Sequence, residues 1–135
     1  MSKSCLLFIF AFSLLITFST ADVIAQEGLL DGKVFVGQYR EKHIRATEED
    51  ELEFMNGRFQ SIGYAQKGFD AAVYSARAEG EKIFFEAETL SSKQGKIKWR
   101  GTVQGDSIEV SYHWSKNGWL NNTEIDYTFN GTLKK

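Results

Sequence analysis

The stretch KIKWRGTVQGDSIEVSYHWS, residues 96–115, decides the fold because its two halves match when one is folded back on the other. A two-residue turn at Gly105-Asp106 gives the hairpin one apolar face and one face of charged and hydroxyl side chains. The pairs predicted on the apolar face are Val103 with Ile108, Gly101 with Val110, Trp99 with Tyr112, and Ile97 with Trp114. Agreement between register, faces and turn residues predicts antiparallel β structure.

Two further hairpins follow from the same reasoning. Asn56-Gly57 is a strong hairpin signal, and Glu79-Gly80 is taken as the turn of the next pair. The pairs predicted from these turns are Phe54 with Phe59, Leu52 with Ser61, Glu53 with Gln60, Ala76 with Ile83, Tyr74 with Phe85, and Ala72 with Ala87. Too few residues follow Gly131 for a hairpin there, so this glycine predicts a bulge or a close backbone approach.

Alternation of apolar and polar residues predicts an all-β domain of eight strands. Their expected ranges are 33–39, 51–55, 58–63, 70–77, 82–90, 96–104, 107–115 and 123–133. Short connections make sequence neighbours spatial neighbours, and pairing the last strand with the first closes an eight-stranded antiparallel up-and-down meander barrel. An open β-sandwich is the alternative. Only residues 41–51 suggest a helical period, and the inward face of the first strand stays open.

Residues 1–25 have the pattern of an export signal: a short positive start, an apolar run over 5–18, and small or aliphatic residues before the expected cleavage after Ala25, with 19–21 as a second candidate. A membrane anchor is the alternative, but the run is shorter than the roughly 20 residues that a spanning helix needs. Cleavage leaves residues 26–135 as a single barrel domain. We expect it to be periplasmic or secreted, without a stable membrane anchor.

Composition narrows the possible partners. The chain carries 16 Lys and Arg against 18 Asp and Glu, a formal net charge of −2, which argues against nucleic acid as a partner. Its one cysteine, Cys5, falls in the predicted leader, so we expect an exported domain held by its core alone. The 11 Phe, 5 Tyr and 3 Trp can supply that core.

Four stretches carry a resemblance to a known superfamily: LDGKVFVG (30–37), KIFFEAET (82–89), GKIKWRGTV (95–103) and YTFNGTLK (127–134). In these stretches the chain resembles the calycins, the lipocalin-like and avidin-like barrels, and above all small exported bacterial barrels. The Gly-x-Trp of true lipocalins is missing, because Gly32 is followed by Lys33 and Val34. The resemblance implies a barrel that holds a small apolar molecule, and it carries over no binding residue.

A set of inward-facing aromatic residues is the candidate ligand site. Small residues between the rings leave room for a ligand, but large and small residues also alternate in a barrel filled by its own side chains. Both alternatives stay open. The candidate lining residues are Tyr74, Phe85, Trp99, Tyr112, Trp114 and Tyr127, with Phe129 beside them.

Trp119 and Leu120 form an apolar pair in a polar loop between the last two strands. Such a pair either folds back to plug the barrel end or stays outside as an anchor for a protein partner, where Trp is favoured. The first alternative is preferred.

Catalytic and metal-binding signatures are absent from the sequence. The acidic run 48–51 lacks the spacing of a calcium loop and is expected to be a solvated loop, while His43 and His113 give no zinc spacing. No nucleophile elbow occurs, and His113 is expected to face outward opposite Lys98.

The leading prediction is therefore a non-catalytic exported barrel that binds a small apolar or aromatic ligand, without a metal or cofactor. The alternative is a filled barrel that binds a protein through loops 40–51 and 115–122, for example as an inhibitor of an extracellular hydrolase. An enzyme that uses loop 43–51 ranks third.

Overall fold

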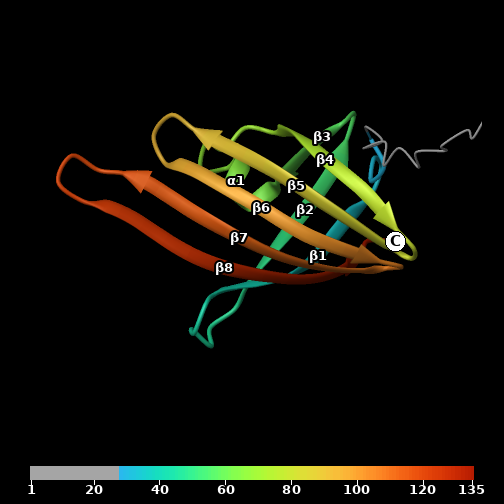
Figure 1. The fold of residues 1–135 in the computed structure, drawn as a ribbon. Coiled ribbons are helices and arrows are strands. Elements are labelled where there is room, and N and C mark those ends of the chain that lie inside the picture. Colours follow the sequence, from blue (N-terminus) through green and yellow to red (C-terminus); the bar gives the residue numbers. More distant parts are fainter. Residues whose placement is uncertain (1–27) are drawn as a thin grey trace, which may run out of the picture.

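The structure is a computed structural model, and it describes residues 28–135; the leader predicted over 1–25 lies outside them. The described residues form eight antiparallel strands and one short helix (Figure 1). Each strand pairs with its neighbours in sequence, and β1 also pairs with β8, so the barrel is closed. The elements are β1 (Val34–Glu41), β2 (Glu48–Met55), β3 (Arg58–Ser61), α1 (Ile62–Ala65), β4 (Ala72–Glu79), β5 (Lys82–Ser91), β6 (Gly95–Gln104), β7 (Ser107–Asn117) and β8 (Asn122–Leu133).

The predicted fold class is confirmed, and so are two of the three predicted registers. In the β6–β7 hairpin Trp99 lies opposite Tyr112, and in the β2–β3 hairpin Phe54 lies opposite Phe59. Gly105 has a φ of 58° whereas Asp106 is not among the residues with positive φ, as a type II′ turn requires. These turns therefore set the faces of their strands as the sequence indicates.

The predicted β4–β5 register is wrong by two residues. Glu79 pairs with Lys82, so the turn is Gly80-Glu81, and Tyr74 faces Ala87 where Phe85 was expected. Gly80 takes the first central position of the turn with a φ of 58°, the position at which a type II′ turn requires glycine. A slip of two residues keeps every side chain on its face, so the predicted inward residues are unaffected.

The segment 41–51 differs from both expectations about it. It forms no helix, and β2 begins at Glu48, so the acidic run lies in a strand and not in a loop. Alternation therefore points two of the four carboxylates, Glu48 and Asp50, toward the barrel interior. The short helix α1 was not predicted; it replaces the end of the strand expected over 58–63.

Glycines form the seam that closes the barrel. Gly37 of β1 pairs with Gly131 of β8, and a Cβ at Gly37 would lie 2.1 Å from the Asn130 carbonyl oxygen. At Gly131 a Cβ would lie 2.7 Å from the Val36 carbonyl oxygen. The predicted close approach at Gly131 is confirmed, since the two strands lie nearer than side chains would allow.

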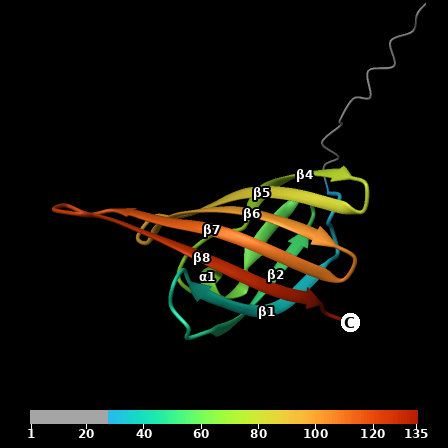
Figure 2. The same ribbon diagram turned by 60° about the horizontal axis from the view of Figure 1, so that its bottom comes forward.

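The two ends of the barrel differ. At one end the turn 28–33 places Leu30 in the core, fully buried, and Asp31 accepts hydrogen bonds from the Tyr74 hydroxyl (2.7 Å) and the Gly57 amide (3.0 Å). At the opposite end, which we call the mouth, the hairpin of β7 and β8 continues past the neighbouring strands (Figure 2). One end is therefore sealed by the chain's own residues, and the other carries the longer loops.

Candidate functional site

A pocket of about 450 Å³ opens at the mouth. Aromatic side chains from five different elements or segments meet around it, together with charged residues from β1, β2 and the segment after α1. We call this the mouth pocket; its lining residues are Tyr39, Arg40, Glu41, Ile44, Ala46, Glu48, Tyr64, Lys67, Phe69, Gln94, Trp114 and Tyr127.

Three tyrosines line the mouth pocket, Tyr39, Tyr64 and Tyr127, and a fourth, Tyr112, packs beneath them. Tyr39 lies 6.0 Å from Tyr64 and 6.2 Å from Tyr127, measured between ring centroids. Tyr112 lies below them and stacks on Tyr127 with centroids 5.0 Å apart and planes 9° apart. The rings thus support one another, and their remaining faces and edges border the pocket.

The tyrosine hydroxyls at the mouth are held as neutral groups. Tyr39 donates a hydrogen bond to the Glu48 carboxylate, and the hydroxyls of Tyr64 and Tyr112 are 3.1 Å apart. Burial is the largest cause that raises the pKa of Tyr39 and of Tyr64 above the ordinary value of 10, and the nearby carboxylates raise the pKa of each further. These hydroxyls therefore stay protonated at neutral pH, able to donate as well as accept.

Asp50 organises the helix that carries Tyr64. Its carboxylate faces inward, accepts a hydrogen bond from the Gly63 amide (2.8 Å), and accepts a second from the Ser61 hydroxyl. Ser61 in turn caps α1 by accepting from the Tyr64 amide at 3.1 Å. These hydrogen bonds allow the Asp50 carboxylate to point inward near the core, because its oxygens have partners there. They also hold α1 so that the Tyr64 ring faces the pocket.

The indole N–H groups of two tryptophans are already used within the protein. Trp114 donates to the Gln94 carbonyl oxygen (2.6 Å), which ties the β5–β6 loop to β7, and Trp99 donates to the Thr89 hydroxyl (2.9 Å). A ligand at the mouth would therefore meet the ring of Trp114 and not its N–H.

The six predicted lining residues all occupy inward positions, but the structure divides them by depth. Trp114 and Tyr127 line the mouth pocket, while Trp99 and Tyr112 lie beneath it, stacked with centroids 4.3 Å apart. Phe85 and Tyr74 lie nearer the sealed end, where both contact Phe54.

The space that the small interior residues leave is taken up by rings. A Cβ at Gly101 would lie 2.3 Å from the Phe85 ring, and Phe59 lies 4.9 Å from Trp99. The sequence left open whether the barrel holds a ligand cavity or is filled by its own side chains. The deep part of the barrel is filled, and the accessible space among the inward aromatic residues lies at the mouth.

Sequence reasoning missed Tyr39, Tyr64 and Glu48. Tyr39 lies on the same face of β1 as Phe35, which is fully buried. Alternation along β1 would therefore have placed Tyr39 inside the barrel once Phe35 was known to point inward. Tyr64 lies in a helix of one turn, which is too short to produce a periodic signal. Glu48 was assigned to a loop, where alternation has no meaning.

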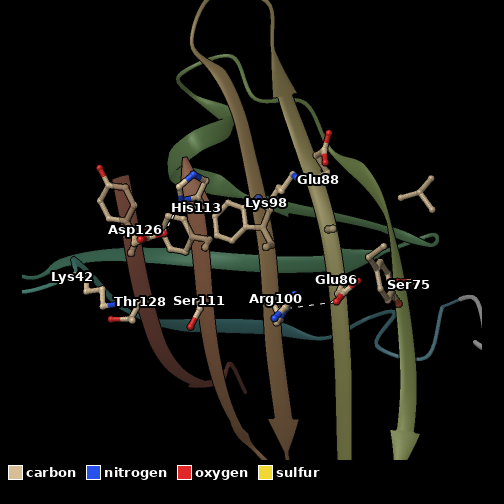
Figure 3. A pocket seen from close by; sticks show the side chains of 16 residues that line it. Lys42, Ser75, Glu86, Glu88, Lys98, Arg100, Ser111, His113, Asp126 and Thr128 are labelled. Carbon is tan, nitrogen blue, oxygen red and sulfur yellow. Dashed lines mark hydrogen bonds and ion pairs between the residues drawn. The ribbon is translucent and has the colours of Figure 1, made fainter. Parts of the chain in front are cut away.

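A second hollow, of about 800 Å³, crosses the outer face of β4 to β8 (Figure 3). Its side chains pair across strands: Arg100 lies 3.6 Å from Glu86, and His113 lies 2.6 Å from Asp126. The hydrogen bond with Asp126 raises the pKa of the His113 imidazole. As predicted, His113 faces outward opposite Lys98. This surface has the character of a solvated sheet face, on which exposed pairs contribute little to stability.

Trp119 and Leu120 lie at the tip of the β7–β8 hairpin. Their exposed fractions are 96% and 80%, so the preferred prediction of a plug is wrong. The two arms stay paired up to Asn117 and Asn122, past the residues that pair with the beginning of β6, and this holds the tip away from the barrel. The physical reason is the length of the hairpin, which alternation alone did not reveal.

Among residues 28–135, no group of three or more His, Cys, Asp or Glu side chains is arranged to hold a metal ion. Within the same residues, no helix has both the length and the apolar character needed to cross a membrane. Searches of family models, of curated proteins and of solved structures found no match to this chain.

Proposed function

We propose that this protein is an exported, non-catalytic barrel of the calycin type that holds a small apolar or aromatic ligand in the mouth pocket. The observation that carries the proposal is the pocket itself: an opening of about 450 Å³ bordered by Tyr39, Tyr64, Trp114 and Tyr127. Small-molecule sites are typically concave, largely apolar and roughly 300–1,000 Å³ in volume, with a few polar groups that orient the ligand.

The architecture supports this placement. The sealed end and the packed middle make a rigid base, so the rings at the mouth need little ordering when a ligand binds. The closed eight-stranded meander agrees with a calycin-like barrel, in which ligands enter at one end. Export rests on the leader pattern over 1–25, which is a property of the sequence.

Native mass spectrometry of the mature protein, purified without denaturation from the exported fraction of its host, tests the proposal. A co-purified molecule of defined mass that is released on unfolding supports it. Protein that is empty, and that also fails to bind the neutral fluorescent probe N-phenyl-1-naphthylamine, contradicts it.

Matched substitutions in the pocket and at the hairpin tip test where the probe binds. Trp114→Leu and Tyr127→Leu keep apolar volume but remove the flat rings, so we expect each to weaken probe binding about tenfold. Trp119→Leu makes the same kind of change at the hairpin tip and should leave probe binding unaltered. Equal effects of all three variants would show that the probe binds elsewhere.

A second candidate function is binding of a protein partner through the hairpin tip, and one observation favours it. Trp119 and Leu120 together expose a large apolar surface on a hairpin whose arms remain paired. Tryptophan is enriched among the residues that contribute most to protein interfaces. An inhibitor of an extracellular hydrolase would present such a tip to a cleft, which is an analogy at the level of fold.

Replacing residues 118–121 by Asn-Gly tests the second candidate, because a two-residue turn closes the same strand pair without the apolar tip. We expect the midpoint of thermal unfolding to stay nearly constant, since the tip has no packing to lose. Affinity capture from the host's exported fraction, with intact and shortened proteins side by side, should then recover a partner with the intact protein alone. Identical captures would contradict the second candidate.

A further inference from the structure

The mouth pocket combines ring faces with acidic groups on inward strand positions. Glu48 begins β2 on the face that also carries Asp50, and Glu41 ends β1 on the face that carries Tyr39. Glu41 and Glu48 both line the pocket, and the Tyr39 hydroxyl holds the Glu48 carboxylate in place. The wall therefore presents negative charge next to aromatic rings.

One of these rings already has a cation against it. The ammonium of Lys67 lies 5.1 Å from the centroid of the Tyr64 ring, within the range of a cation–π contact. Lys67 belongs to an exposed segment after α1, so its side chain can leave the ring at little cost. The other basic lining residue, Arg40, stands on β1 between the inward residues Tyr39 and Glu41, and its neighbour across the sheet is Thr128 on the outer face.

Resting on the proposed function, we infer that the ligand of the mouth pocket is an organic cation with a flat apolar body. Its ammonium group would lie against the tyrosine rings near Glu48 and Glu41, where Lys67 now supplies a positive charge. Its apolar body would contact Trp114 and Tyr127.

The titration behaviour of the tyrosines agrees with a negative field at this site. Burial is the largest cause that raises the pKa of Tyr127, and the charges of Glu41 and Glu48 raise it further. Asp50 and Glu48 act in the same direction on Tyr64. A field that opposes a tyrosinate favours a bound cation.

Three soluble probes of one shape test the charge preference: 2-phenylethylammonium, 2-phenylethanol and phenylacetate, titrated calorimetrically at pH 7 and low ionic strength. We expect the cation to bind about tenfold more tightly than the alcohol, and phenylacetate to bind most weakly. Added salt should reduce the advantage of the cation.

Two substitutions at neighbouring positions of β2 test whether Glu48 causes the preference for the cation. Glu48→Gln removes one of the two charges and keeps an acceptor for the Tyr39 hydroxyl, so the preference for the cation over the alcohol should fall several-fold. Glu49→Gln makes the same change one residue along β2, on the outward face, and should leave the preference intact. Circular dichroism of both variants checks that the barrel is folded.

Lys67→Met should change the affinity for the cation in the opposite direction. Removing the resident ammonium uncovers the Tyr64 ring, so 2-phenylethylammonium should bind several-fold more tightly while 2-phenylethanol changes little. Lys82→Met, at the sealed end, is the control.

The outcomes separate the two proposals. Equal affinities for cation and alcohol, or tighter binding of phenylacetate, would overturn the cation inference and leave the ligand pocket standing. No binding of any of the three probes would overturn the proposed function as well. Loss of the preference in Glu49→Gln would place the charge effect on the outer face and contradict the inference.

Discussion

At the scale of the residue, Trp99 separates the packed interior from the accessible mouth. It is 2% exposed, stacks on Tyr112, and has its N–H satisfied by Thr89. Trp99→Ala should lower the free energy of unfolding by about 3–5 kcal/mol, because it removes a large buried ring and leaves a cavity. Urea denaturation followed by circular dichroism measures this cost.

Trp119→Ala is the comparison for that measurement. Its side chain is 96% exposed, so the change should stay within about 0.5 kcal/mol. A large loss of stability on Trp119→Ala would show that the tip packs on the barrel after all. A small loss on Trp99→Ala would mean that the interior is less tightly filled than its ring contacts indicate.

At the scale of the element, the β1–β8 seam depends on glycine for steric reasons. Gly37 has an ordinary negative φ, yet a Cβ there would lie 2.1 Å from a backbone carbonyl oxygen of the opposite strand. Gly37→Ala must therefore push β1 and β8 apart, and we expect it to cost more than the roughly 1 kcal/mol typical of glycine replaced at positive φ.

Gly105→Ala is the control at this scale. Its φ of 58° makes alanine strained, but nothing lies within 4 Å of a Cβ there. Thermal unfolding of the two variants should rank Gly37→Ala as the more damaging. The reverse order would show that the seam opens readily and that β1 contributes little to closure.

At the scale of the whole molecule, the five tyrosines should make the stability of the fold depend on pH in the alkaline range. Burial is the largest cause of a raised pKa at each of the five tyrosines. At Tyr74, burial and the hydrogen bond with Asp31 raise the pKa to about 12. A raised pKa in the folded state stabilises the fold fully below the unfolded pKa of about 10, and this contribution is lost as the pH rises through the folded values.

Alkaline unfolding should therefore begin above about pH 10 and coincide with the appearance of tyrosinate absorbance near 295 nm. Tyr74→Phe removes one of the groups and should reduce the steepness of the loss. Tyrosinate absorbance that rises near pH 10 while the circular dichroism remains native would contradict the burial of these hydroxyls.

Local signals were enough for much of the fold. Asn56-Gly57 and Gly105-Asp106 set two registers correctly, because a two-residue turn and an alternating pattern each restrict the same pairing. At Gly80 the pattern was ambiguous, since a slip of two residues leaves every face unchanged, and only the backbone conformation at the turn decided the register.

The candidate site was predicted in part. Trp114 was found from the register of its hairpin and Tyr127 from alternation along the last strand, and both line the mouth pocket. Tyr39 was missed because the first strand had no assigned inward face, and Glu48 because the second strand was expected to begin only at residue 51. Tyr64 was missed because a single helical turn has no period.

Alternation and turn chemistry act between near neighbours, so eight strands, the closed meander and most of the inward aromatic residues could be predicted from the amino-acid sequence, Tyr39 and Tyr64 excepted. Which of those residues are packed in the interior and which are accessible at the mouth became clear only from the three-dimensional arrangement of the strands and loops. Depth along the barrel depends on which end the turn at Leu30 seals and on how far the β7–β8 hairpin extends past the mouth. The seal depends on contacts between segments distant in sequence, such as Asp31 with Tyr74, and no local pattern records them. How far the hairpin extends past the mouth follows from its length relative to β6, which is fixed by the register of the paired strands.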